Sequence, residues 1–325
     1  MNILVGMSGG VDSSTAALML KEQGHKVIGV TMAIYRGKLN TTTSYKCGGA
    51  CYSADEKEDI EAARNICNQI GIEYYVFDCV EKYNEIVLEK FKKEYLSGRT
   101  PNPCVWCNSL IKFDVLPRIA GLNGIEFDKF ATGHYARIEE EDGRYILKRG
   151  KNPKKDQSYF LYRLKQEQLK NILLPLGDYT KEEIRKRAEK CGLAVADKPD
   201  SQDFYEGDYK ELLGVDPKPG NIVDTDGKVL GEHQGIWNYT IGQRKGLGIS
   251  SSEALYVIEL RKDTNEVVVG FKDKTFSDRL TAVDLNWIAI DKLEKEISCQ
   301  AKIRSTQSPA NVRVKPLDSG NIEVL

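Results

Sequence analysis

The chain has 325 residues, 41% of them hydrophobic and 29% charged, with a formal net charge of −1. This length and composition predict a globular protein of two or three domains, and the charge gives no overall sign of a nucleic-acid partner. No apolar run is long enough to cross a membrane. Residues 1–6 lack a basic flank and lead directly into a glycine turn, which predicts a first strand and not a signal peptide. We therefore expect a cytoplasmic protein without a membrane partner.

Strand and helix patterns alternate through the first part of the chain. Strands are predicted at 2–5, 26–31, 73–77 and 129–132, and helices at 12–22, 55–70 and 81–95. Strands that alternate with helices pair in parallel through right-handed crossovers. The predicted fold class is α/β, with a doubly wound parallel sheet whose ligands bind at the carboxyl ends of the strands.

The character of the sequence changes after about residue 205. Glycine and proline are dense from 217 to 248, and short β-branched stretches follow at 255–260, 266–269, 300–304 and 311–314. Such patterning is typical of small sheets and barrels. We predict an ATP-binding domain over 1–205, a small glycine-rich central domain over 206–249 and a β-barrel over 250–325.

A glycine- and serine-rich motif lies between the first strand and the first helix. It reads Gly6-Met7-Ser8-Gly9-Gly10-Val11-Asp12-Ser13-Ser14. Paired glycines bring backbone N–H groups close to an anion, the helix N-terminus adds partial positive charge, and the serines add hydroxyl donors. Asp12 sits where a carboxylate could hold Mg²⁺ bound to phosphate. The alternative is an ordinary turn with serine caps, and no Gly-Lys-Ser/Thr ending is present to grip a terminal phosphate.

This motif resembles the pyrophosphate loop of the ATP pyrophosphatases, which release AMP and pyrophosphate by adenylating an oxygen. Further motifs resemble those of the tRNA-specific 2-thiouridylases, in order along nearly the whole chain. They are RTPNP at 99–103, CN at 107–108, ATGHYA at 131–136, KDQSYFL at 155–161, GEHQG at 231–235 and IGQRKGLG at 241–248. The resemblance implies a fold like that of the adenine nucleotide alpha hydrolases, and ATP-dependent conversion of a wobble uridine to 2-thiouridine.

The same resemblance implies where the substrates bind. ATP is expected against residues 6–14, Met32 and Gly133, with Mg²⁺ held by Asp12. For the tRNA it implies contacts at these residues: Asn102, Pro103, His134, Lys155, Asp156, Gln157, Arg304 and Gln307. The other expected partner is a sulfur donor, either sulfide or a persulfide carrier protein, and the expected state is a monomer or weak dimer.

One stretch of the chain is strongly basic. Between 144 and 165 the only acid is Asp156, and the bases are Arg144, Lys148, Arg149, Lys151, Lys154, Lys155, Arg163 and Lys165. Such a stretch could track RNA phosphates, and the alternative is a solvated surface face.

The cysteines depart from the family pattern. Its better-known members carry one cysteine after Asn-Pro-Asp and a second after a downstream Asp-Ser motif, which together relay a persulfide. Cys107 matches the first cysteine, but the aspartate is replaced by Cys104, and Tyr205 stands where the second cysteine is expected. The chain is therefore interpreted as a variant lacking the second catalytic cysteine, because a phenol cannot carry a persulfide.

Two close cysteine pairs, Cys104 with Cys107 and Cys47 with Cys51, leave three hypotheses open. Three of these thiolates could hold a 4Fe-4S cluster, as in other sulfur-inserting members of the superfamily. Alternatively, Cys107 could carry a persulfide that another cysteine resolves, or all four could bind structural Zn²⁺. Packing in the core is predicted for the remaining four, Cys67, Cys79, Cys191 and Cys299.

Two rival functions remain. An adenylating ligase of a small acid would need neither the cysteine pairs nor the KDQSY motif. A tRNA-binding protein that has lost thiolation would have no reason to keep the glycine loop intact.

Overall fold

The computed structural model describes residues 1–35, 52, 55–195, 204–205, 207 and 209–325. Two compact units are present. The first comprises Met1–Val87, Pro103–Gly207 and Asn286–Lys292, and the second Leu88–Asn102, Asp208–Leu285 and Leu293–Leu325. No helix among the described residues is both long and apolar enough to cross a membrane.

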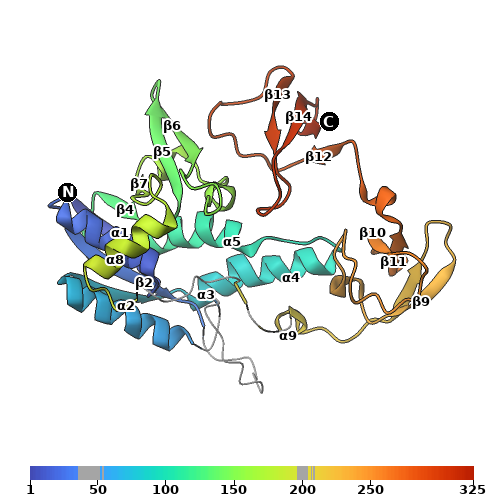
Figure 1. Ribbon diagram of the computed structural model, residues 1–325, viewed down its shortest axis with the longest axis horizontal. Coiled ribbons are helices and arrows are strands. Elements are labelled where there is room, and N and C mark those ends of the chain that lie inside the picture. The colour runs from blue at the N-terminus through green and yellow to red at the C-terminus, as the bar shows by residue number, and fades with distance from the viewer. Residues whose placement is uncertain (36–51, 53–54, 196–203, 206, 208) are drawn as a thin grey trace. The chain divides into compact units, whose positions relative to one another are not determined.

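A five-stranded parallel sheet forms the centre of the first unit (Figure 1). Its order is β3-β2-β1-β4-β7, from β1 (Asn2–Gly6), β2 (Lys26–Ala33), β3 (Glu73–Asp78), β4 (Lys129–Ala131) and β7 (Ile172–Leu173). Every neighbouring pair is parallel. This arrangement confirms the predicted fold class of the N-terminal part, and four of the strands lie where the sequence pattern places them.

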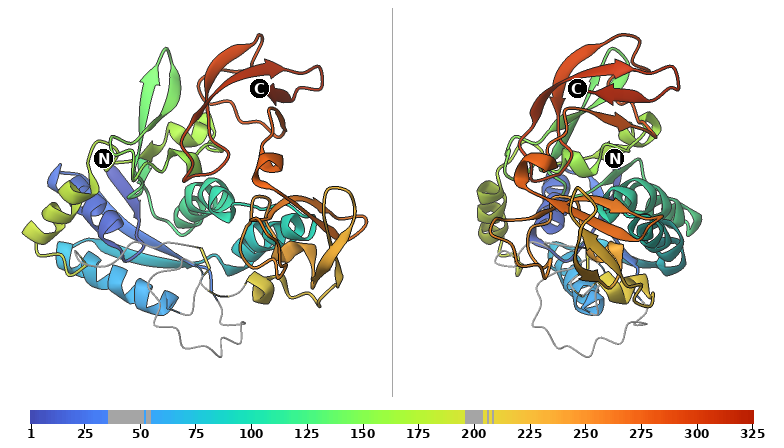
Figure 2. Two further views of the ribbon diagram at one scale, coloured as in Figure 1. Left: turned by 45° about the vertical axis from the view of Figure 1, so that its right-hand side comes forward. Right: turned by 90° about the vertical axis from the view of Figure 1, so that its right-hand side faces the viewer.

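Helices cover both faces of this sheet (Figure 2). Ile3 and Val5 of β1 share a buried cluster with residues of α1 (Val11–Glu22), α2 (Glu56–Ile70) and α8 (Lys181–Lys190). Leu4 points to the other face, and its register partner Phe130 packs against Phe113 of the π-helical segment η2 (Cys107–Val115) at 5.7 Å between ring centroids. The carboxyl end of β1 therefore lies between two helical layers.

The helix predicted at 81–95 is three consecutive elements. They are α3 (Val80–Tyr83), the π-helical segment η1 (Asn84–Leu88) and α4 (Glu89–Leu96). Another helical run follows, from α5 (Pro103–Trp106) through η2 to α6 (Leu116–Leu122). A π-helical turn is uncommon and is found frequently at functional sites.

A hairpin that the sequence reading did not predict stands out from the sheet (Figure 1). Its strands are β5 (Ala136–Glu141) and β6 (Arg144–Arg149), joined by Asp142 and Gly143 with φ values of 50° and 76°. Two positive φ angles in a two-residue loop are the geometry of a type I′ turn. The 3₁₀ turn η3 (Ser158–Phe160) and the short helix α7 (Gln166–Leu169) follow.

Two four-stranded sheets belong to the second unit. The first has the order β10-β11-β8-β9, from β8 (Gly220–Val223), β9 (Val229–His233), β10 (Tyr256–Arg261) and β11 (Glu266–Gly270). Its strands lie on both sides of residue 249, where the sequence analysis places a domain boundary. The short elements beside it are α9 (Tyr209–Leu213), η4 (Ile236–Asn238) and η5 (Lys272–Thr275).

The last sheet is antiparallel. Its order is β12-β15-β14-β13, from β12 (Leu280–Ala282), β13 (Ile297–Ala301), β14 (Ala310–Pro316) and β15 (Ile322–Val324). Strand β14 covers the predicted stretch 311–314 and β13 overlaps the start of 300–304, whereas β12 and β15 were not predicted.

Candidate active site

The glycine-rich loop is fixed to the sheet by its own backbone. Met7 N donates to Val30 O at 2.8 Å, and Thr31 Oγ1 donates to Met7 O at 2.7 Å. Gly9 has a φ of 68°, and a Cβ there would lie 2.5 Å from the Asp59 carbonyl oxygen of α2. The position therefore requires glycine, both for its conformation and for the close approach of α2.

Gly10 is the N-cap of helix α1, and among the described residues this helix has no capping side-chain hydrogen bond. The first N–H groups of a helix have no partner within the helix, and together with the helix dipole they favour an anion. The loop therefore fits a nucleotide phosphate. Met7 and Val11 bury their side chains in the core, so they can contribute to the cradle only through the backbone.

The serine hydroxyls are placed differently from what the sequence reading expected. Ser14 is buried, and its Oγ donates to Gly10 O at 2.8 Å. Ser13 Oγ donates to the same carbonyl at 3.3 Å and accepts from Ser8 N at 3.1 Å. Ser8 alone of the three is exposed. The hydroxyls of Ser13 and Ser14 therefore stabilise the loop itself. The sequence analysis expected them to face the anion.

Gly133 and Met32 come from the ends of β4 and β2, the two strands that flank β1. A Cβ on Gly133 would lie 2.6 Å from Asp12 C and 2.7 Å from Ser13 N, so the chain after β4 touches the first turn of α1. Met32 is half-buried on β2, which pairs with β1. The structure therefore brings Gly133 directly against the loop and places Met32 on the adjacent strand.

Asp12 is held by two residues that the sequence reading missed. Its Oδ1 accepts from Lys181 Nζ at 2.7 Å and from Tyr135 Oη at 2.8 Å. Lys181 is 5% exposed at the start of α8, where Thr180 and Glu183 form a capping box. That box is readable in the sequence, but the burial of the lysine beside Asp12 depends on how α8 packs on α1.

Cys107 is the first residue of η2 and is buried, whereas Cys104 in α5 is half-buried. The neighbouring Asn108 is 3% exposed. Its Nδ2 donates to Phe160 O at 3.2 Å, but its buried Oδ1 has no hydrogen-bond partner among the residues that the structure describes. Unpartnered buried acceptors are rare in folded proteins, and this one directly follows the predicted sulfur-bearing residue.

His134 directly follows Gly133 and packs against η2. Its Nδ1 is 2.7 Å from Thr132 Oγ1, and its ring packs against Phe113 of η2 at 5.7 Å. Burial lowers the pKa of His134 to about 3, and the positive charge of Lys112 adds to this lowering. The imidazole is therefore neutral at physiological pH, so it can exchange hydrogen bonds but does not bring a positive charge.

This lowered pKa predicts a pH dependence of stability. Unfolded histidine takes up its proton near pH 6.5, whereas folded His134 does so near pH 3, so the free energy of unfolding falls as the pH drops through this window. We expect a His134→Gln variant to show a flatter decline between these pH values. Urea denaturation at a series of pH values measures it, and equal slopes for both proteins would contradict the expectation.

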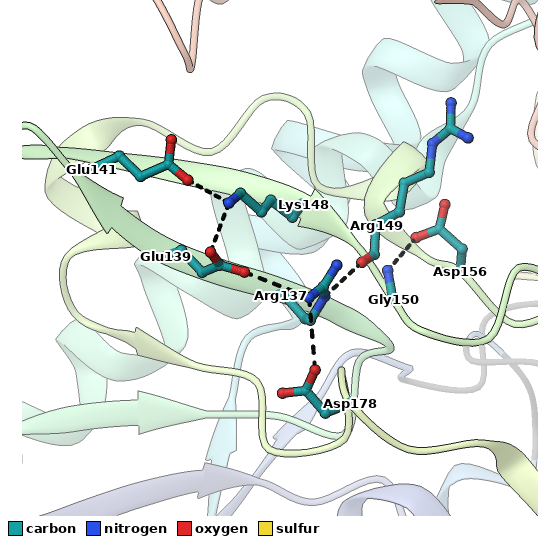
Figure 3. Close-up of polar contacts among 8 residues, drawn as sticks. All are labelled: Arg137, Glu139, Glu141, Lys148, Arg149, Gly150, Asp156 and Asp178. Atoms are coloured by element: carbon teal, nitrogen blue, oxygen red, sulfur yellow. Dashed lines mark hydrogen bonds and ion pairs between the residues drawn. The ribbon is translucent and has the colours of Figure 1, made fainter.

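The segment that contains Lys155, Asp156 and Gln157 is anchored to the hairpin. Asp156 Oδ1 accepts from Gly150 N at 3.0 Å (Figure 3) and from Ser158 N at 3.1 Å. Gln157 Oε1 accepts from Tyr135 N at 2.9 Å. These two side chains thus shape the backbone beside Tyr135, and Lys155 is half-buried.

Two residues of the basic stretch make contacts with other residues of the protein. Lys148 pairs with Glu139 at 2.6 Å and with Glu141 (Figure 3). Arg144 donates to Ile290 O at 2.7 Å and pairs with Asp291. These contacts engage Lys148 and Arg144 with acids and carbonyls of the protein, so neither is the simple solvated charge that the sequence suggests. Four other bases of the stretch, Arg149, Lys151, Lys154 and Lys165, are exposed.

The remaining tRNA-contact predictions fall in different units. Pro103 lies in the first unit, as the first residue of α5, whereas Asn102 belongs to the second. Arg304 and Gln307 are exposed in the turn between β13 and β14, where Gln307 N donates to Arg304 O at 3.2 Å.

The other cysteines divide into two kinds. Cys67 and Cys79 are buried, and burial raises their pKa to about 12 and about 11, which keeps both thiols protonated. Packing is thus confirmed for them. Cys191 and Cys299 are exposed, so the packing interpretation is wrong for these two. Cys47 and Cys51 lie outside the described residues, and the described residues contain no group of three metal-binding side chains.

Tyr205 is part of an aromatic cluster. It is 5% exposed, and its ring centroid lies 6.4 Å from that of Tyr52, which stacks on Tyr83 at 5.5 Å. Tyr52 N also donates to Phe204 O at 2.8 Å. The residue at this position therefore packs the end of the α/β domain.

Comparison with known proteins covers the whole chain. Residues 1–205 match the family model of the tRNA methyl transferase HUP domain, 211–271 that of the PRC-barrel domain, and 277–325 that of the aminomethyltransferase β-barrel domain. The tRNA-specific 2-thiouridylase MnmA of Endomicrobium trichonymphae is 47% identical over 100% of this chain and 91% of its own length. Similar proteins of the same name occur in Clostridium botulinum (46%; 99% and 89%) and Acetivibrio thermocellus (45%; 99% and 90%). These matches show a HUP domain, a PRC-barrel domain and a C-terminal β-barrel, and the chain belongs to the tRNA-specific 2-thiouridylase family.

Proposed function

We propose that this protein uses ATP to activate a uridine carbonyl of tRNA and replaces its oxygen with sulfur, giving 2-thiouridine. The observation that carries the proposal is the N-terminus of α1 behind Gly9 and Gly10, where a glycine at the N-cap supplies no capping side chain and Gly133 packs against the first turn. This geometry supports a phosphate cradle, and the chain matches 2-thiouridylases over its full length. ATP and tRNA are both cytoplasmic, so the proposed reaction is a cytoplasmic one.

The chemistry needs activation because a uracil carbonyl has no leaving group. In the proposed reaction the carbonyl oxygen attacks the α-phosphorus of ATP and releases pyrophosphate. A sulfur nucleophile then adds to the ring carbon, and AMP leaves with the original oxygen. With hydrosulfide as the donor, the sulfur keeps its oxidation state and its proton passes to solvent.

Residues 6–14, Met32 and Gly133 would hold the nucleotide. Asp12 would contribute one oxygen to Mg²⁺, which neutralises phosphate charge when bound. Among the described residues its Oδ1 is shared by Lys181 and Tyr135, while its Oδ2 makes no hydrogen bond. One carboxylate oxygen is therefore left for the cation, which fits that role.

Cys107 is proposed as the residue that delivers sulfur or binds it. If Cys107 carries a persulfide, its terminal sulfur bonds to the activated ring carbon and AMP leaves. A second thiol then attacks the Cys107 sulfur, which breaks the S–S bond, leaves the transferred sulfur on the base and forms a disulfide with Cys107. Cys104, three residues earlier and half-buried, is proposed for this step because Tyr205 cannot supply it. Anaerobic purification with iron, sulfide and zinc quantified separates this route from a 4Fe-4S cluster or Zn²⁺ held together with Cys47 and Cys51.

The tRNA is proposed to lie along Lys155–Gln157 and the exposed bases of the hairpin end, Arg149, Lys151 and Lys154, with His134, Asn102 and Pro103 near the base. Arg304 and Gln307 are proposed as further contacts from the C-terminal domain. Positive side chains of this kind position the RNA backbone without reading its sequence.

An Arg149→Ala/Lys151→Ala/Lys154→Ala variant should bind tRNA more weakly at low salt. Each lost phosphate contact lowers the slope of log K against log salt by about 0.7 to 0.9, so we expect a decrease of about 2 to 3. The matched control is Lys57→Ala/Lys186→Ala/Lys190→Ala, which removes the same charge from exposed positions elsewhere. Filter binding at several salt concentrations measures both, and equal slopes for the two variants would contradict the assignment.

The function itself is tested by incubating the full chain with unmodified tRNA, ATP and sulfide, followed by nucleoside mass spectrometry. We expect ATP-dependent 2-thiouridine at the wobble position. Freshly prepared anaerobic enzyme that binds tRNA but forms no thiolated nucleoside would favour a tRNA-binding protein that has lost thiolation.

A further inference from the structure

The first turn of α1 contains an acid inside a cradle built for an anion. Asp12 is the second residue of this helix, and its side chain is 28% exposed. A triphosphate brought to the same turn would meet the negative charge of Asp12 at close range. Binding of ATP is therefore opposed unless that charge is compensated.

Lys181 supplies a compensating charge from another helix. Its ammonium lies 2.7 Å from Asp12 Oδ1, and its side chain is only 7% exposed. Tyr135, 2% exposed, donates to the same oxygen at 2.8 Å, and the ammonium lies 5.9 Å from the centre of its ring. Lysine is rarely buried in proteins unless it is paired, so this arrangement is an unusual way to join α8 to α1.

Packing alone does not require this pair. Ile184 and Ala188 of α8 are fully buried and already join the clusters that contain α1 residues. Buried ion pairs can often be replaced by apolar side chains without loss of stability. The position of the pair, at the turn where the phosphates are proposed to bind, points to a role in binding.

We propose that Lys181 is a positioning residue that neutralises Asp12 and holds its Oδ1, so that the cradle accepts ATP and Oδ2 remains directed to the cation. Tyr135 is the second residue that holds Asp12 Oδ1 in place. The inference rests on the proposed function, because it assumes that the glycine loop binds ATP. The alternative role for Lys181 is direct contact with a phosphate of ATP. In that case the effect of Lys181 on ATP binding would not depend on the charge of Asp12.

The test is the dissociation constant of ATP for the full chain, measured by isothermal titration calorimetry in the presence of EDTA. The variants are Lys181→Met, Asp12→Asn, and the two combined. We expect Lys181→Met to bind ATP at least about tenfold more weakly, because one negative charge is left uncompensated. The double variant should return to within about threefold of the unsubstituted protein, because it restores the net charge of the pair. Lys186→Met, an exposed position on the same helix, should change nothing.

Two outcomes overturn the proposal. Unchanged binding by Lys181→Met would leave the pair with a packing role only. A double variant as weak as Lys181→Met would show that the lysine contacts phosphate directly. If Lys181→Met does not fold, the double variant, which contains neither buried charge, still decides between compensation and direct contact. Failure of the unsubstituted protein to bind ATP would overturn the proposed function itself.

Discussion

Substitution of Cys107 with serine is expected to abolish tRNA thiolation while ATP binding is retained. Serine is close in size to cysteine, so it should leave the buried start of η2 intact. A hydroxyl can neither carry a persulfide nor deliver a thiolate to the activated carbon, and the rate should fall by about three orders of magnitude or more. Nucleoside mass spectrometry of the tRNA product and calorimetry with ATP measure the two properties separately.

Cys191→Ser is the matched control, because Cys191 is an exposed thiol at the end of α8. It should keep full activity. Thiolation by Cys107→Ser at the rate of this control would refute the role given to Cys107. Iron content gives a second readout, since a full complement of iron in a Cys104→Ser/Cys107→Ser variant would exclude these residues as cluster ligands.

Substitution of Gly133 with alanine is the second change with a large expected effect. The added Cβ would lie 2.6 Å from Asp12 C and 2.7 Å from Ser13 N, both backbone atoms that cannot rotate away. The first turn of α1 must therefore move, and overpacking of this kind costs about 1 to 3 kcal/mol. We expect the affinity for ATP to fall by about tenfold or more.

Gly121→Ala provides the comparison for this change. Gly121 lies inside α6, and a Cβ there would meet nothing within 4 Å. Alanine should leave ATP affinity unchanged and alter the free energy of unfolding by no more than about 1 kcal/mol, in the stabilising direction. Calorimetric titration of both variants with ATP gives the comparison, and normal binding by Gly133→Ala would remove Gly133 from the site.

Much of the α/β domain is readable from local patterns. Short apolar strands and amphipathic helices alternate along 1–132, and this alternation alone predicts a parallel sheet. The glycine loop is equally readable, because Gly9 and Gly10 fall between the first strand and the first helix. The pattern does not predict which group each serine hydroxyl binds, since Ser13 and Ser14 could face either an anion or the Gly10 carbonyl.

The errors have physical causes. The dipeptide Asp142-Gly143 favours a type I′ turn and could have predicted the hairpin β5–β6. The sequence analysis instead interpreted this stretch by its basic charge. Arg144 and Lys148 bind acids and carbonyls that lie close only after folding. Lys181 gave no local signal at all, because its partner Asp12 is 169 residues away in the sequence.

The family match also separates the rival functions. A small-acid ligase would not align with 2-thiouridylases over the full chain, as this protein does at 47% identity. The proposed absence of a second catalytic cysteine, with Tyr205 at its position, bears on how sulfur arrives, and the proposed cradle for ATP does not depend on it. Activation of the base and delivery of sulfur can therefore be tested in separate assays.

The most direct measurement follows the terminal phosphates of ATP during the reaction with tRNA and a sulfur donor. With ATP labelled at the γ-phosphate, we expect the label in pyrophosphate, released only when tRNA is present, with AMP formed in equal amount to 2-thiouridine. Label appearing as orthophosphate together with ADP would mean that the loop transfers or hydrolyses the terminal phosphate, and base adenylation would be contradicted.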